Sequence, residues 1–278
     1  KADPNLFVDR DWFVGRTDGH TPVSIATLRN HISIVRILLE AKANADEYCG
    51  GKKTVDLAIR NERFDALELL VAAKADIDSI YNNENINNPY DTTPLHTAIR
   101  CAMLGSRTTD AVGILINAKV DVDRCAKING YTDVTPLELA AAQGNVDVAS
   151  MLLEAKADMN KGYPVLEAVR STHSRTARAD AVRLLVNAKA FIHTSHFDDS
   201  QTPAHYAAQH ANEELLRILI EAKADMNKVD INGETPTATL LVPAKGTSTT
   251  ACADNRKPAC DPQLKKKKRK RHQRMPWP

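Results

Sequence analysis

The sequence predicts an all-α solenoid in which pairs of short helices stack side by side. One phrase, close to Ala-Lys-Ala-Asp, recurs six times, around Lys42, Lys74, Lys119, Lys156, Lys189 and Lys223. A second phrase precedes most of these copies, and it opens with Thr-Pro at Thr21, Thr93, Thr135, Thr202 and Thr235. In four units, the alanine near the end of the first stretch stands 17 residues before the alanine that follows the lysine. Such regular internal spacing indicates a repeat protein.

Each Thr-Pro phrase predicts the start of a short first helix. A threonine side chain caps free backbone N–H groups at a helix start, and proline suits the first helical position. A second helix is predicted next, because apolar residues recur at helical spacing, as at Ile34, Ile37, Leu38 and Ala41. One helix pair buries too little surface alone, so neighbouring pairs are expected to share a continuous core.

These residues resemble the ankyrin repeat family. Thr93-Pro94-Leu95-His96-Thr97-Ala98 matches the family's Thr-Pro-Leu-His-x-Ala pattern, and the period of about 33 residues agrees with it. The resemblance covers residues 1–242 and implies a solenoid of helix-turn-helix units joined by short hairpin loops. The expected units are 1–15 (partial), 16–47, 48–87, 88–129, 130–160, 161–196, 197–229 and 230–242 (a half-unit). We expect residues 243–278 to form a disordered basic tail.

The chain departs from the family pattern at the six lysines of the first phrase. The family usually has glycine there, next to a helix end where the backbone often needs a positive φ. Each lysine should therefore cost roughly 1 kcal/mol of stability. The attraction between a cation and the helix C-terminus should offset a few tenths of this.

Other departures concern single units. With the units numbered from 16–47 as the first, the second reads Lys53-Thr54-Val55-Asp56 and the fifth reads Tyr163-Pro164-Val165-Leu166, so both lose the histidine of the pattern. The connections at residues 79–92 and 123–134 are longer than usual. Extra residues separate the two predicted helices at 104–109 and at 171–178. Because residues 1–5 match the end of a repeat, we expect the chain to be part of a longer protein.

Composition and charge exclude several classes of protein. The chain is 43% apolar and 26% charged, which is normal for a folded soluble protein, and no run approaches the roughly 18 apolar residues of a membrane helix. Five cysteines without a Cys-x-x-Cys motif argue against a disulfide scaffold and a zinc site. The sequence therefore favours an intracellular protein, cytoplasmic or nuclear, with no membrane insertion.

No catalytic or cofactor motif is present. The sequence has no glycine-rich phosphate loop, no Gly-x-Ser-x-Gly and no His-Glu-x-x-His. The resemblance implies that His96 and His205 bond backbone groups between units. His193 and His196 form a weak metal pattern without a second ligand pair. We therefore expect no enzyme activity, no cofactor and no metal.

The resemblance also implies a concave groove lined by residues two and three positions after the marker alanine of each first helix. The candidate groove residues are Arg29, Arg60, Arg100, Gln143, Arg170, Gln209 and His210. Arginine binds carboxylates and phosphates through two bonds, so the hypothesis is a groove for an acidic or phosphorylated segment of a protein partner. The alternative is a set of solvated helix ends, where cations are favourable in any case. Tyr81, Tyr90 and Tyr131 are candidate partner contacts at loop tips.

The last 36 residues differ sharply in charge from the rest. Residues 243–278 hold 11 basic and 2 acidic residues, whereas residues 1–242 hold 26 and 33. Such a basic run is a candidate nuclear-import signal or a non-specific nucleic-acid contact, and it lacks aromatic residues for base stacking. The run consists of Lys265, Lys266, Lys267, Lys268, Arg269, Lys270 and Arg271.

The sequence as a whole predicts a non-enzymatic scaffold or adaptor that binds another protein as a monomeric module. Two alternatives remain open. The array can be a targeting module of a larger enzyme or channel, or the chain can act in the nucleus through its basic tail.

Overall fold

The computed structural model describes residues 4–5, 20–49, 52–82, 91–102, 109–128, 131–171, 174–195 and 200–241. All of these residues belong to one compact unit, residues 1–241. Its helices are α1 (Pro22–Leu28), α2 (Ile32–Glu40), α3 (Thr54–Arg60), α4 (Phe64–Ala72), α5 (Pro94–Ala102), α6 (Thr109–Asn117), α7 (Pro136–Ala142), α8 (Val146–Glu154), α9 (Pro164–Arg170), α10 (Arg175–Asn187), α11 (Pro203–Gln209), α12 (Glu213–Glu221) and α13 (Pro236–Leu241).

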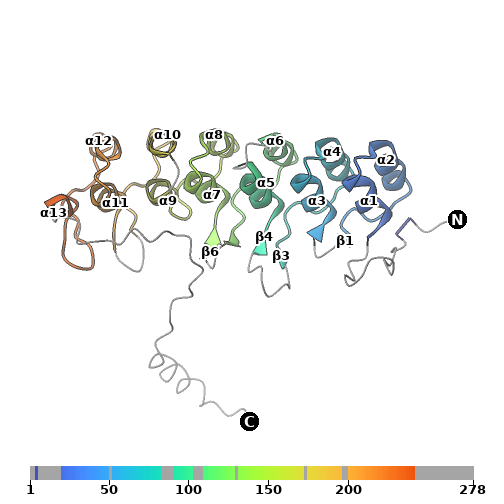
Figure 1. Ribbon diagram of the computed structural model, residues 1–278, viewed down its shortest axis with the longest axis horizontal. Helices are drawn as coiled ribbons and strands as arrows, with labels where there is room; N and C mark the ends of the chain where they lie inside the picture. The colour runs from blue at the N-terminus through green and yellow to red at the C-terminus, as the bar shows by residue number, and fades with distance from the viewer. Residues whose placement is uncertain are drawn as a thin grey trace, which may run out of the picture. The chain divides into compact units, whose positions relative to one another are not determined.

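The helices form two parallel rows (Figure 1). The first helices of the units, α1, α3, α5, α7, α9 and α11, make one row, and the second helices, α2, α4, α6, α8, α10 and α12, make the other. The hairpin connections lie along the far side of the first helices (Figure 1). This arrangement confirms the predicted all-α solenoid of stacked helix-turn-helix units.

The predicted caps begin several helices. Thr21 Oγ1 accepts a hydrogen bond from Ser24 N at 3.3 Å. Thr135 makes a capping box, because its Oγ1 accepts from Glu138 N while Glu138 Oε2 accepts from Thr135 N. Among the second helices of the units, α10 is the longest, because the extra residues of its unit form an additional helical turn. Ser174 Oγ caps its start by accepting from Ala177 N.

The six lysines end the second helices with a left-handed residue, as predicted. Their φ angles all lie between 63° and 67°. In the first unit, Lys42 N donates to Leu39 O and Ala43 N donates to Leu38 O, and this pair of bonds closes the last turn of α2. An L-residue in this region is strained, whereas glycine is not.

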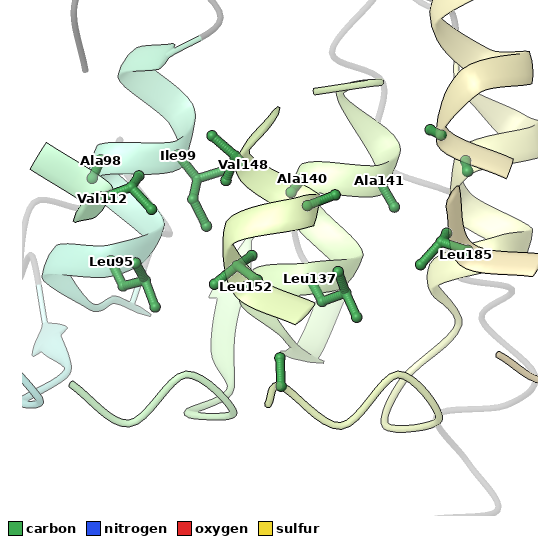
Figure 2. Packing of buried hydrophobic residues seen from close by; sticks show 14 of the residues in the cluster. Leu95, Ala98, Ile99, Val112, Leu137, Ala140, Ala141, Val148, Leu152 and Leu185 are labelled. Atoms are coloured by element: carbon green, nitrogen blue, oxygen red, sulfur yellow. The ribbon is translucent and has the colours of Figure 1, made fainter. Parts of the chain in front are cut away.

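The core runs through the whole array. Leu95, Leu137 and Leu152 are at most 1% exposed, and small residues such as Ala98 and Ala140 lie where the helices approach closely. Figure 2 shows leucines and alanines from α5, α7, α8 and α10 converging between the two rows. Because each unit contacts mainly its neighbours, the stability of one unit depends on the next.

The two long connections pair with each other, which the sequence did not predict. β1 (Tyr48–Cys49) and β2 (Lys52–Lys53) form a separate two-stranded hairpin. β3 (Tyr81–Asn82), β4 (Asp91–Thr92), β5 (Ala126–Ile128) and β6 (Tyr131–Val134) form a four-stranded antiparallel sheet in that order. Asp91 of β4 pairs with Lys127 of β5, so the sheet joins the connections of two successive units.

A second row of contacts links the hairpins. In five units the backbone N–H two residues after the lysine donates to an acidic or amide side chain of the preceding hairpin, at 2.7–2.9 Å. The pairs are Asn44 N with Asn5, Asp76 N with Asp46, Asp121 N with Asp78, Asp158 N with Asp123 and Phe191 N with Asn160. These bonds fix the register of one unit against the next.

Candidate functional site

The predicted groove residues lie at two adjacent positions near the ends of the first helices. Arg60, Arg170 and Gln209 are the last residues of α3, α9 and α11, and Arg100 lies near the end of α5. Arg29, Gln143 and His210 are the residues that follow α1, α7 and α11. The first helices stack side by side (Figure 1). These seven residues therefore lie at or near the C-terminal ends of the row α1, α3, α5, α7, α9 and α11.

Arg60 is held by a buried carboxylate of its own helix. Arg60 Nε donates to Asp56 Oδ2 at 2.7 Å, and the Asp56 side chain is only 3% exposed. Asp56 stands where other units have the histidine of the repeat pattern. The i,i+4 spacing of Asp56 and Arg60 was readable in the sequence, although the burial of Asp56 was not. The arginine therefore neutralises a core carboxylate, and its side chain stays 35% exposed.

Arg170 joins two units. Its Nη1 donates to Glu167 Oε1 at 3.0 Å, and its guanidinium carbon lies 5.3 Å from the centre of the Tyr206 ring in α11. A cation over an aromatic face is attracted by the ring, typically by about 0.5–2 kcal/mol. Sequence reasoning missed Tyr206, because the contact depends on stacking of α9 against α11.

The Cys101 thiol is close enough to Arg60 and Arg100 to feel both charges, but it is not activated as a nucleophile. Burial raises the pKa of the Cys101 thiol, and the carboxylates of Asp56 and Glu62 act in the same direction, while the two arginines oppose them. A thiol with a raised pKa stays protonated at neutral pH and reacts slowly.

The two pattern histidines connect units as the resemblance implied. His96 Nε2 lies 3.0 Å from Val134 O and His205 Nε2 lies 2.9 Å from Glu234 O, so each ring N–H donates to the next unit. In both, Nδ1 pairs with the threonine that caps the helix, at 2.8 Å. This arrangement uses the neutral imidazole, and both rings are fully buried.

Mild acid should weaken the array through His96. Burial lowers the pKa of His96 to about 4, and the charge of Arg100 acts in the same direction, against the bond to Val134. Because the folded pKa lies below the ordinary value of about 6.5, the neutral ring stabilises the fold above pH 6.5, and this contribution fades as pH falls towards 4. Between pH 6.5 and 5 we expect a loss of about 2 kcal/mol in unfolding free energy. Urea titrations should show a flatter pH profile for His96→Gln, whereas exposed His210→Gln should follow the original chain. An unchanged slope in His96→Gln would refute the assignment.

Glu138 takes the place of the histidine in the fourth unit. Whereas the His96 ring donates to the next unit, Glu138 accepts from it: Glu138 Oε1 accepts a hydrogen bond from Tyr163 N at 3.2 Å. A Cβ at Gly162 would lie 2.5 Å from Glu138 Oε2, and Gly162 has a φ of +74°, so glycine is required there. Burial raises the pKa of the Glu138 carboxyl to about 7; the charge of Glu167 adds to this, and bonds from Thr135 and Tyr163 oppose it.

In the described part of the chain, no group of three or more His, Cys, Asp or Glu residues is placed to hold a metal ion. None of the helices in those ranges has the length and apolar character needed to cross a bilayer.

An open hollow lies over the second helices α4 and α6. Its volume is about 470 Å³, and it is lined by Asn30, Glu62, Phe64, Asp65, Glu68, Asp110, Gly113, Ile114 and Asn117. Asp65 and Asp110 occupy first turns of helices, where a negative charge is favourable. Two of the four acidic residues that line the hollow thus have a structural explanation.

For the other predicted contact residues, the structure describes at most the backbone. Tyr81 and Tyr131 begin the edge strands β3 and β6 of the four-stranded sheet. Tyr90, His196 and the basic run 265–271 lie outside the described residues. Partner contact by the tyrosines, and a nuclear or nucleic-acid role of the run, therefore stay predictions.

Solved structures with the same fold support this architecture. The ankyrin repeat domain of Bcl-3 aligns with a TM-score of 0.65 and 20% identity, over 80% of this chain and 94% of that one. An ankyrin repeat domain from Acinetobacter baumannii aligns with a TM-score of 0.63 and 21% identity, over 73% of this chain and 98% of that one.

Two relatives by sequence are much longer proteins. The ankyrin repeat and KH domain-containing protein mask-1 of Caenorhabditis elegans is 29% identical over 53% of this chain and 5% of its own length. Neurogenic locus notch homolog protein 1 of Rattus norvegicus is 30% identical over 62% of this chain and 7% of its own. The chain thus spans a small part of these relatives.

Family models agree with the repeat pattern along most of the array. A model of three ankyrin repeats matches residues 2–81 and 79–163, and a model of many ankyrin repeats matches residues 172–220 and 204–236. These matches include the Thr-Pro helix starts, the lysine phrases and the histidines that link units. With the stacked helix pairs and bonded hairpins described above, they establish that the chain belongs to the ankyrin repeat family.

Proposed function

We propose that this chain is a non-enzymatic scaffold or adaptor that holds an acidic or phosphorylated segment of a partner protein along the C-terminal ends of its first helices. Ankyrin repeats are general protein–protein interaction modules. The observation that carries the proposal is the row of Arg29, Arg60, Arg100 and Arg170, which occupy one or the other of two adjacent positions at the ends of stacked first helices.

The intramolecular ion pairs are compatible with this role. A guanidinium has five N–H donors in a fixed plane, so the Nε bond from Arg60 to Asp56 uses one of them. The side chains of Arg60 and Arg170 are 35% and 28% exposed, which leaves part of each at the surface. Side chains held in place by neighbours lose less conformational entropy on binding than free ones.

Tyr206 adds a second kind of contact at the same place. Tyrosine and arginine are over-represented among the residues that dominate binding energies at interfaces. Because Arg170 lies over the Tyr206 ring, units five and six present both residue types together. We expect this end of the row to contribute most of the affinity.

The test is binding of the full chain to an array of acidic and phosphorylated peptides, each with its neutral counterpart. The variant carries Arg29→Gln, Arg60→Gln, Arg100→Gln and Arg170→Gln. Glutamine is chosen because charge reversal at Arg60 would place a second carboxylate beside buried Asp56. We expect peptides held by the original chain to bind the variant roughly tenfold or more weakly.

A matched control removes arginine charges from the second helices instead. Arg36→Gln, Arg183→Gln and Arg217→Gln change residues that are all exposed on α2, α10 and α12. The control should bind as the original chain does, and circular dichroism should show equal helix content in all three. Equal peptide binding by the groove variant would show that the row is not the binding surface.

A further inference from the structure

At one end of the array, helix α2 exposes an apolar face. Ile34 and Ile37 are 48% and 63% exposed. Ile34 stands eight residues before the left-handed lysine of its unit. The five later residues at that position are at most 1% exposed, and they are Ala66, Ala111, Val148, Ala181 and Leu215.

The two ends of the array show which neighbour covers this position. Within the described residues, α12 has a second helix before it and none after it, yet Leu215 and Ile218 are only 1% and 5% exposed. Helix α2 is followed by α4, yet Ile34 and Ile37 are exposed. The positions of Ile34 and Ile37 are therefore buried by the preceding unit, whereas Ile220, 54% exposed, lies on the opposite side of its helix.

The hydrogen bonds that link neighbouring hairpins include one to a residue that precedes α1. Asn44 N donates to Asn5 Oδ1 at 2.7 Å, which repeats the bond from Asp76 N to Asp46 Oδ1. Asn5 stands two residues after Asp3, at the same place in the lysine phrase as Asp46 in its own. Asn5 thus occupies the hairpin position of a unit that lies before α1.

We infer that the face formed by Ile34 and Ile37 is a docking surface for the second helix of a further ankyrin unit, which precedes the unit of α1 and α2 in the stack. The interfaces between the later units show which kind of residue the docked helix should present. Three residues before each lysine, on the side towards the next unit, the chain always has an aliphatic residue. The docked helix should present such a residue to Ile34 and Ile37.

The test supplies such a unit from the chain itself. Residues 135–155 are fused directly before Lys1, so that Lys1 takes the place of Lys156 and the array continues in register. Amide hydrogen exchange of α2 is then compared in the original and extended full chains. We expect exchange in α2 to slow by roughly tenfold or more, because a covered helix opens less often.

A substitution separates docking from a general gain in stability. Ile37→Lys should barely change the melting temperature of the original chain, but lower that of the extended chain by about 5 °C. Ile220→Lys, at the opposite end, is the matched control and should act equally in both. These differences would support the docking surface.

Three outcomes would overturn the inference. Exchange in α2 that is already as slow as in α4 of the original chain would mean that the face is covered. Equal effects of Ile37→Lys in both chains would mean that the added unit does not dock there. Concentration-dependent self-association of the original chain, abolished by Ile37→Lys, would identify a second copy as the occupant.

Discussion

Replacement of the six left-handed lysines by glycine is expected to stabilise the array by about 3 kcal/mol and to raise its melting temperature by roughly 10 °C. All six have φ angles of 63–67°, where an L-residue costs about 1–2 kcal/mol. Glycine relieves this strain but loses about 0.5–1 kcal/mol in chain entropy, and the lost charge costs a few tenths of a kcal/mol at the helix C-terminus. The net gain is therefore about 0.5 kcal/mol per site, and sites in different units should add. Thermal unfolding of the sixfold variant measures it.

The matched control changes the same six lysines to alanine. Alanine removes the charge but keeps the Cβ that causes the strain, so it should bring no stabilisation. It should even lose the few tenths of a kcal/mol that each cation gains at a helix C-terminus. If the alanine and glycine variants have the same melting temperature, backbone strain at these positions does not reduce the stability of the array.

Glu138→Gln is expected to stabilise the array at pH 8 by on the order of 3 kcal/mol and to have little effect near pH 4.5. The pKa of Glu138 is raised to about 7 from its ordinary 4.5, chiefly by burial. A carboxyl with a raised folded pKa stabilises the fold fully below its unfolded pKa, and this contribution is lost as pH rises through 7. Glutamine stays neutral and keeps an acceptor for Tyr163 N. Denaturant unfolding at several pH values measures the difference.

An exposed carboxylate of the same unit is the control for this prediction. Glu154→Gln, at the end of α8, removes a charge at the surface and should leave the pH profile unchanged. The wild-type chain should lose stability between pH 4.5 and 8 in a way that Glu138→Gln does not. Parallel profiles for the wild-type chain and Glu138→Gln would show that Glu138 does not titrate in this window.

His96 and Glu138 act at equivalent positions with opposite pH dependence. His96 favours the fold above its unfolded pKa, and Glu138 favours it below pH 7. Taken together, these two residues place the greatest stability of the array between roughly pH 5 and 6.5. The junction between units four and five should therefore open first in mild alkali, and the junction between units three and four in mild acid.

The features that the sequence predicted rest on local patterns. Thr21 and Thr135 cap helices because the bonds span three residues. The lysines adopt positive φ because each helix ends at the same point of a repeated phrase. His96 and His205 link units as the family pattern implied. In each case a few neighbouring residues determine the structure.

The candidate groove was predictable only in part. The repeat register gave the positions of Arg60 and Arg170, and it showed that they follow equivalent helix ends. It did not show that Asp56 is buried beneath Arg60 or that Tyr206 lies under Arg170, since both facts depend on packing between units. These contacts decide how much charge the groove presents to a partner.

By itself the sequence determined the repeat, the helix pairs, their caps and the class of the protein, because these follow from periodicity and short-range hydrogen bonding. Only the tertiary structure decided which side chains meet across units. Glu138 reaches Tyr163 across 25 residues, and Asp91 pairs with Lys127 only because two long connections lie side by side. Such contacts form when stacking closes the distance, and no local pattern records that distance. The exposed isoleucines of α2 follow the same principle, since the sequence shows an apolar helix and only the stacked array shows which of its faces is left uncovered.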